Sequence, residues 1–125
     1  MPVPVKSVRA IRGAIQLDVD EREHVLIATR ELVSSVLEAN SLTADDVISI
    51  LFTATPDVHS EFPAVAAREL GLGEVPLMCT QELDIVGAMP MVIRLMAHVN
   101  TTLSHGQISH IYLRGATALR RDLAQ

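Results

Sequence analysis

The sequence predicts an α/β (α+β) fold, in which helices cover a mixed β-sheet. Apolar runs of strand length alternate along the chain with segments of helical periodicity, a pattern typical of this class. The chain has 125 residues, which is enough for one hydrophobic core and too few for two. No repeat, low-complexity stretch or linker interrupts it, so we expect residues 1–125 to form a single domain.

The first two elements are a strand and a long helix. Residues 5–11 have the composition of a strand, which we expect to end at Gly13. Residues 18–40 predict an amphipathic helix, because apolar side chains recur at three- and four-residue spacing with charged residues on the other side. Asp20 and Glu23 resemble a capping box, and the final asparagine is a suitable stop.

The middle of the chain continues the alternation. Residues 43–46 predict a short capped turn before the apolar run 47–53, which is typical of a strand covered on both faces. Residues 55–63 form a loop. The second helix is predicted over residues 64–70, with a proline in its first turn and a glycine after its end.

The last part of the chain predicts two strands and a helix between them. Residues 75–79 form a short strand and residues 81–88 a connection. Residues 89–99 predict a third helix that is apolar nearly all round, so we expect it to be covered on both sides. Residues 108–113 form the last strand, with His110, Tyr112 and Arg114 on one face.

Composition and charge exclude several classes of partner. The net charge of −5 argues against a nucleic-acid or acidic-membrane partner, because both favour a basic face. With no Trp, one Tyr and two Phe, the chain lacks aromatics for base stacking. It has no 18-residue apolar run and no signal-peptide core, and its single cysteine fits a reducing compartment. These features predict a soluble, cytoplasmic protein.

The apolar content is high for so small a domain. The apolar set makes up 49% of the chain and six glycines add about 5%, which exceeds the ~45–50% that is usual on the same count. Association into an oligomer is the simplest use for this surplus. A neighbouring subunit would then cover the third helix.

The motifs of common catalytic centres are missing. There is no phosphate-binding glycine loop or dinucleotide fingerprint, and the five histidines lack the spacing of metal ligands. Asp57 and His59 could hold an ion, but a polar pair bordering a loop is the simpler interpretation. Cys79 is interpreted as a small buried residue or weak donor rather than a catalytic thiolate. We therefore expect neither a metal nor a cofactor.

What remains is a set of arginines in apolar surroundings or at strand ends: Arg12, Arg68, Arg94, Arg114 and Arg120. A surface salt bridge or a snorkelling side chain would explain most of them. Arg94 lies in the most apolar segment, and its guanidinium cannot lose its proton, so it needs a carboxylate such as Glu82, an anionic ligand, or both. Such a set suits binding of a small polyanion, or a reaction that needs a fixed conformation and a cation near developing negative charge.

Five stretches resemble, in order and spacing, the small AroH-type chorismate mutases: "IRGA", "TATPDVHSEFPAVAAREL", "VPLMCTQELDI", "VIRLM" and "HIYLRGATALRRDL". The resemblance covers about residues 8–123. It implies a monofunctional, cofactor-free isomerase that converts chorismate to prephenate by a Claisen rearrangement, within the shikimate pathway of aromatic amino acid biosynthesis. It also implies a homotrimer that resembles an α/β barrel, with an active site in each cleft between subunits.

The resemblance further implies roles for individual residues. Arg94 would contact the ether oxygen and a carboxylate of chorismate, while Arg12 and Tyr112 would hold the enolpyruvyl carboxylate. Glu82 and the Cys79 region would meet the ring hydroxyl. Phe62, Ala64 and Leu119 would form apolar walls. Arg68 and Arg120 would supply positive charge near the cleft mouth.

Three positions depart from the family pattern, namely Val65, Met78 and Arg121, and none of them is central to the expected site. Two alternative functions stay open at this point. An imine deaminase of the RidA kind has a similar trimeric architecture, with an arginine in an intersubunit cleft. A non-catalytic protein could instead bind an aromatic-pathway diacid without converting it.

Overall fold

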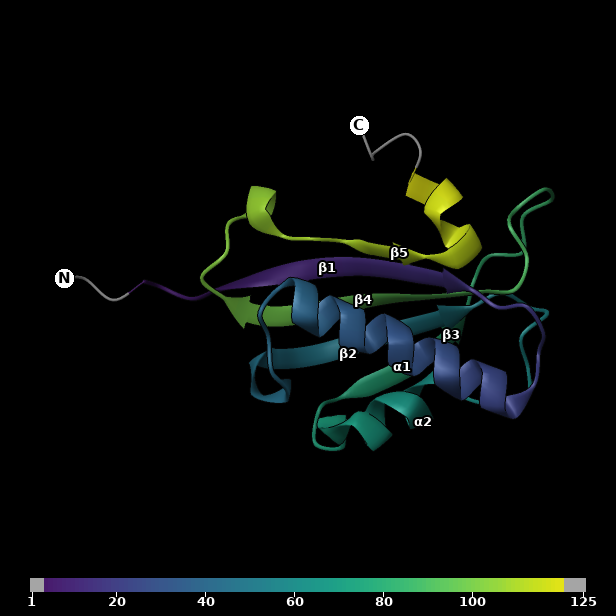
Figure 1. Cartoon of the computed structure of the whole chain (residues 1–125), viewed down its shortest axis with the longest axis horizontal. Coiled ribbons are helices and arrows are strands. Elements are labelled where there is room, and N and C mark those ends of the chain that lie inside the picture. The colour runs from purple at the N-terminus through teal and green to yellow at the C-terminus, as the bar shows by residue number, and fades with distance from the viewer. Residues whose placement is uncertain (1–3, 121–125) are drawn as a thin grey trace.

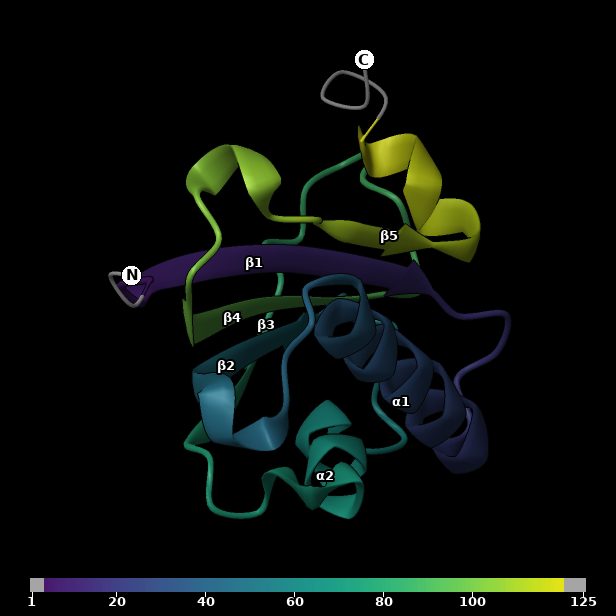
Figure 2. The same cartoon turned by 60° about the vertical axis from the view of Figure 1, so that its left-hand side comes forward.

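A five-stranded mixed sheet runs through the molecule, and both α-helices lie against one of its faces (Figures 1 and 2). The computed structural model describes residues 4–120. The strands are β1 (Ser7–Gln16), β2 (Val47–Ala54), β3 (Leu77–Gln81), β4 (Val92–Thr101) and β5 (Ile111–Leu113), in the spatial order β3-β2-β4-β1-β5. The predicted fold class is therefore confirmed.

Strand β4 is the centre of the sheet. It pairs antiparallel with β1 on one side and with β2 on the other. The two edge strands run parallel to their neighbours, β3 to β2 and β5 to β1. The sheet is thus mixed, and its N-terminal strand lies between the last two strands of the chain.

The helices bury their apolar sides against one face of this sheet. Helix α1 spans Arg22–Ala39, and α2 spans Pro63–Ala67 and continues as a wider turn over Arg68–Leu72. The wider turn contains Gly71 at φ 94°, a left-handed conformation that glycine adopts readily. The larger core side chains between helices and sheet include Leu32 and Phe52, both fully buried. None of the helices described is long and apolar enough to cross a membrane.

The prediction of a helix over residues 89–99 is wrong, because this segment forms most of β4. From Ile93 to Thr101 the odd-numbered side chains are buried, while Arg94, Met96, His98 and Asn100 lie on the other face. The alternation is hard to see in the sequence because Met96 is apolar although it lies on the face without helices. Two flanking strands supply the hydrogen bonds that a helix would have supplied internally.

Several smaller predictions need correction. β1 continues past Gly13, and there a Cβ atom would lie 3.1 Å from Leu32 of α1, so glycine lets the helix approach the sheet. Asp20 does not cap α1, since its carboxylate binds a different loop. β2 was predicted to be covered on both faces, but within this chain only one face is covered. Leu51, on the other face, is 40% exposed. The third strand begins two residues later than predicted, and the last strand is shorter.

Asn40 ends α1 as predicted and also joins it to the segment before β5. Its side chain is 2% exposed, donates to the carbonyls of Val36 and Ser109 at 2.9 Å, and accepts from the Ser109 N–H at 2.8 Å. A buried amide that loses such partners costs about 1–3 kcal/mol. Asn40 therefore stabilises the packing of β5 as well as the helix end.

We expect Asn40→Ala to lower the free energy of unfolding by about 1–3 kcal/mol, because the part-buried Ser109 backbone groups lose their partners. Urea denaturation would measure the loss. The matched control is Glu38→Ala on the exposed side of the same helix end, which should change stability by less than about 0.5 kcal/mol. Equal stability of the two variants would contradict this role.

Candidate active site

The face of the sheet that carries no helix brings several predicted site residues together. Strand register places Tyr112 beside Ala14, Ala14 beside Arg94, and Arg94 beside Thr53. Because side chains alternate along strands, these four residues lie in one row on the same face. We call this surface the open face.

Arg94 forms an ion pair with Glu82, which follows β3. Its Nε lies 3.0 Å from Glu82 Oε1, although the N–H is not aligned for a hydrogen bond. The Glu82 side chain is 23% exposed and that of Arg94 is 41% exposed. The Thr53 hydroxyl donates to the same Glu82 oxygen at 2.5 Å. Glu82 is thus confirmed as the carboxylate beside Arg94, and the guanidinium keeps part of its surface open to a ligand.

Arg12 and Tyr112 approach Arg94 from the other side. Arg12 lies opposite Met96, which is two positions from Arg94 on β4. Arg12 and Arg94 are therefore diagonal neighbours, roughly 7–8 Å apart. The Arg12 backbone N–H donates to His110 Nδ1 at 2.9 Å. Two guanidinium groups and one carboxylate therefore share the open face.

A small apolar cluster borders this group. Its buried members are Ala14, Val92 and Ala116, and Tyr112 and Leu119 pack against them. The chain reaches this position because the 3₁₀ segment Arg114–Arg120 turns back beside β5 (Figure 2). Leu119, predicted as an apolar wall, thus packs against the same cluster as Tyr112.

A hollow of about 470 Å³ opens where the parallel strands β2 and β3 end. Its lining includes Phe62, Cys79, Thr53 and the loop residues 58–61. Phe62 is 67% exposed, while Cys79 is half-buried and packs against the core. Thr53 connects the two parts of the site, because it lines the hollow and also binds Glu82.

Of the three remaining predicted residues, Ala64 and Arg68 are not brought to this group. Ala64 is 3% exposed and packs in the main core. Arg68 is exposed at the end of α2 and does not line the hollow. Arg120 ends the last 3₁₀ segment, and its side chain lies outside the described part of the structure.

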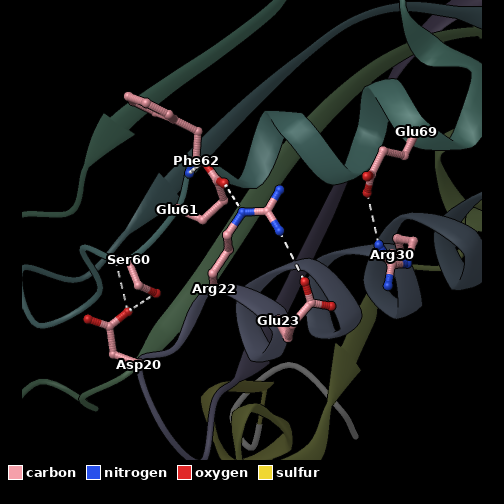
Figure 3. A network of polar contacts seen from close by, with 8 residues as sticks. All are labelled: Asp20, Arg22, Glu23, Arg30, Ser60, Glu61, Phe62 and Glu69. Carbon is pink, nitrogen blue, oxygen red and sulfur yellow. Dashed lines mark hydrogen bonds and ion pairs between the residues drawn. The ribbon is translucent and has the colours of Figure 1, made fainter.

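The loop that carries Phe62 is held against the start of α1 by a polar network (Figure 3). Asp20 accepts hydrogen bonds from the backbone N–H groups of His59 and Ser60 and from the Ser60 hydroxyl at 2.6 Å. Arg22 donates to Glu61 at 2.8 Å, and Glu61 accepts the Phe62 N–H at 2.9 Å. These contacts fix one wall of the hollow.

The network lowers the pKa of two of its carboxyl groups. Burial raises the pKa of Asp20, but hydrogen bonds from Ser60 and the His59 and Ser60 backbone, with the nearby His59 ring, outweigh it, so the net pKa is below its usual value. For Glu61 the hydrogen bond from the Phe62 backbone lowers the pKa most, burial raises it, and the hydrogen bond and charge of Arg22 lower it further, so the net pKa is below its usual value.

Asp57 and His59 do not share an ion-binding position. His59 faces Asp20, with its Nδ1 3.5 Å from the carboxylate, whereas Asp57 accepts the backbone N–H of Met91 at 3.1 Å. Within residues 4–120, no three His, Cys, Asp or Glu side chains are grouped so that they could hold a metal ion.

Sequence reasoning missed Thr53 and the polar loop residues of the hollow. The sequence contained a signal, because "TATPD" places polar side chains directly after an apolar strand, and the carboxyl ends of neighbouring parallel strands form such sites. Chemically, the site offers two cations, one carboxylate held close to a cation, and an adjoining partly apolar hollow. This set fits a small, partly apolar dianion that also carries a hydroxyl group.

Comparison with known proteins gives a consistent result. The family model described as "Chorismate mutase type I" matches residues 8–123. The chain is 44% identical over 117 residues to chorismate mutase AroH of Thermus thermophilus, covering 93% of this chain and 96% of that protein. It is 42% identical over 118 residues to chorismate mutase AroH of Bacillus subtilis (strain 168), covering 94% and 93%.

A solved structure is also similar. It is a chorismate mutase from Clostridium thermocellum, which is 41% identical in sequence and superposes with a TM-score of 0.87. The match covers 88% of this chain and 98% of that one. The likeness therefore extends from the sequence motifs to the arrangement of the strands.

The lowered pKa of Asp20 predicts how stability depends on pH. A carboxyl group with a depressed folded pKa stabilises the fold above its unfolded pKa, about 3.9 for Asp, and this stabilisation disappears as the pH falls through the folded value. Asp20→Asn should therefore be less stable than the original chain at neutral pH, and the difference should vanish in strong acid.

Urea denaturation at a series of pH values would measure this difference. The control is Asp18→Asn, at an exposed position in the same connection. A gap between Asp20→Asn and the original chain that stays constant down to strongly acidic pH would contradict the role given to the Asp20 charge.

Proposed function

The chain belongs to the type I chorismate mutase family, and from this membership we propose how its residues carry out the reaction. It is a chorismate mutase, an isomerase that rearranges chorismate to prephenate in aromatic amino acid biosynthesis. Chorismate carries two carboxylates, a ring hydroxyl and an enolpyruvyl ether. The observation that supports our assignment of roles is the Arg94–Glu82 pair on the open face.

Arg94 stabilises the charge that develops during the rearrangement. The ether C–O bond breaks ahead of C–C bond formation, so partial negative charge collects on the ether oxygen. A guanidinium already held in place stabilises that oxygen more in the transition state than in the ground state, which accelerates the reaction. Glu82 orients Arg94 before the substrate arrives, and no general base is required.

The other polar residues hold chorismate in the folded conformation from which it reacts. Arg12 and Tyr112 bind the enolpyruvyl carboxylate, which fits their position beside Arg94 on the open face. Glu82 and the Cys79 region meet the ring hydroxyl. The folded conformation is rare for chorismate in water, but it is the only conformation that fits the site.

The remaining predicted residues surround the substrate more loosely. Phe62, Ala64 and Leu119 form the apolar walls, and of these Ala64 is buried in the main core of this chain. Arg68 and Arg120 supply positive potential near the cleft mouth. The exposed position of Arg68 agrees with such an indirect role.

The magnitudes are consistent with this division of roles. A rate enhancement of ~10⁶-fold, near the low end for enzymes, requires about 8 kcal/mol. One well-placed charged donor supplies about 3–4 kcal/mol. Conformational restriction can contribute the rest, since positioning alone is worth up to ~7–11 kcal/mol.

We further propose that three copies assemble through the open face. Leu51, Met78 and Met96 lie together on this face and are 40%, 60% and 38% exposed. Arg94 is also partly open to water, where its electrostatic effect would be weak. A second copy over this face would bury the apolar side chains and exclude water from the site.

Family membership favours the rearrangement over the two alternatives considered from the sequence. An imine deaminase would process an imine rather than chorismate, and a binding protein would retain chorismate unchanged. Following chorismate loss and prephenate appearance with purified protein separates all three possibilities. The cytoplasmic location stays a prediction, which cell fractionation would check.

Arg94→Ala should lower kcat by about 10²–10³-fold, because it removes the donor to the ether oxygen. Arg94→Lys should recover little of the loss, since an ammonium cannot reproduce a two-pronged contact. Steady-state kinetics on chorismate would measure both. The matched control is Arg30→Ala, which removes an arginine paired with Glu69 on the helical side. A kcat for Arg94→Ala near that of the control would contradict the assignment.

Light scattering should give a mass of three chains for the active protein. Leu51→Glu places a charge on the open face, so we expect smaller species and a loss of activity together. Ile27→Glu is the control, because Ile27 is 50% exposed on α1, away from this face. An active monomer would contradict the proposed assembly.

A further inference from the structure

The segment Thr53–Asp57, which begins within β2, binds Glu82 and also the start of β4, the strand that carries Arg94. Its first half holds Glu82. The Thr53 hydroxyl donates to the Glu82 carboxylate at 2.5 Å, and the Glu82 N–H donates to the Ala54 carbonyl at 2.9 Å. Glu82 is thus attached to this segment by both its side chain and its backbone.

The second half of the segment holds the start of β4. Thr55, 9% exposed, accepts the Val92 N–H on its hydroxyl oxygen at 3.0 Å, and its own N–H donates to the Val92 carbonyl at 3.0 Å. The Thr55 hydroxyl donates to Asp57 at 2.5 Å. Both Asp57 oxygens accept the Met91 N–H at 3.1 Å. We call Thr55 and Asp57 together the β4 clamp.

The clamp acts where the backbone is strained. Met91 has φ 59°, a left-handed conformation that is unfavourable for a residue with a side chain. Its N–H is held by Asp57, and its carbonyl accepts the Leu17 N–H at 2.7 Å. Arg94 follows three residues later on the central strand, so the conformation at Met91 determines how β4 enters the sheet.

We propose that the β4 clamp is a positioning device for the rearrangement: it fixes Arg94 in the place relative to Glu82 that the reaction requires. This inference rests on the role proposed for Arg94. A donor stabilises developing charge only within hydrogen-bonding distance of the charged atom, and a misplacement of about 1 Å can cost ~10²-fold in rate. Neither clamp residue needs to contact the substrate.

Thr55→Val tests the clamp with little change of shape, because it replaces the hydroxyl with a methyl group and removes only the hydroxyl contacts. We expect kcat to fall about 10–100-fold with KM within about threefold, since transition-state contacts depend most on position. Thr55→Ser keeps the hydroxyl and should restore kcat to within about threefold. Asp57→Asn, at an exposed position, should show a smaller kcat loss and a folded protein.

Asp46→Asn is the matched control. Asp46 also accepts a backbone N–H, that of Thr43 at 2.9 Å. It lies just before β2 begins, at the opposite end of that strand from Thr55. It should lower Tm with kcat unchanged. If Thr55→Val does not fold, Asp57→Asn decides the question on its own.

Two results would overturn the inference: a normal kcat in folded Thr55→Val and Asp57→Asn, or a kcat loss that Thr55→Ser does not restore. Arg94→Ala is measured in parallel. Full activity of Arg94→Ala would overturn the role of Arg94 itself, whereas an inactive Arg94→Ala beside fully active clamp variants would overturn the clamp alone.

Discussion

The ion pair between Arg94 and Glu82 is the interaction on which the site depends. A guanidinium stays charged at every pH at which a protein folds, so the chain must hold a carboxylate beside it or leave it to water. Glu82 meets that need from the end of an edge strand, and Thr53 orients it. The central position of β4, hydrogen-bonded on both sides, keeps the cation fixed while part of it stays open to the substrate.

The fold class and most elements could be predicted from the sequence because the apolar pattern of each element matches one type of secondary structure. Residues 22–39 show the helical spacing, and residues 47–54 show a short apolar run bounded by turns. The segment 92–101 was predicted as part of a helix over residues 89–99, since Met96 is apolar on the outer side of the alternation and methionine suits helices as well as strands. Asp20 was misplaced as a cap because its partners lie about forty positions away.

The residues of the site were easier to predict than its geometry. The charge of Arg94 in so apolar a stretch predicted a carboxylate partner or an anionic ligand, with Glu82 as the candidate carboxylate, and the ion pair with Glu82 is present. Their surroundings were not, because the open face exists only through the register of four strand pairings. Thr53 was missed for the same reason. The polar residues after the apolar run mark the end of the strand, but only the register with β3 and β4 shows that Thr53 lies beside Glu82 and Arg94.

The strand order also has a consequence for biosynthesis. β4 lies between β1 and β2 in space but is made after both, and β5 comes later still. A nascent chain that ends before residue 92 therefore has no strand to join its two halves, and the inner edges of β1 and β2 stay open to pairing with other chains. The sheet can close only after β4 has left the ribosome, so β1 and β2 wait for a strand that is made after both of them.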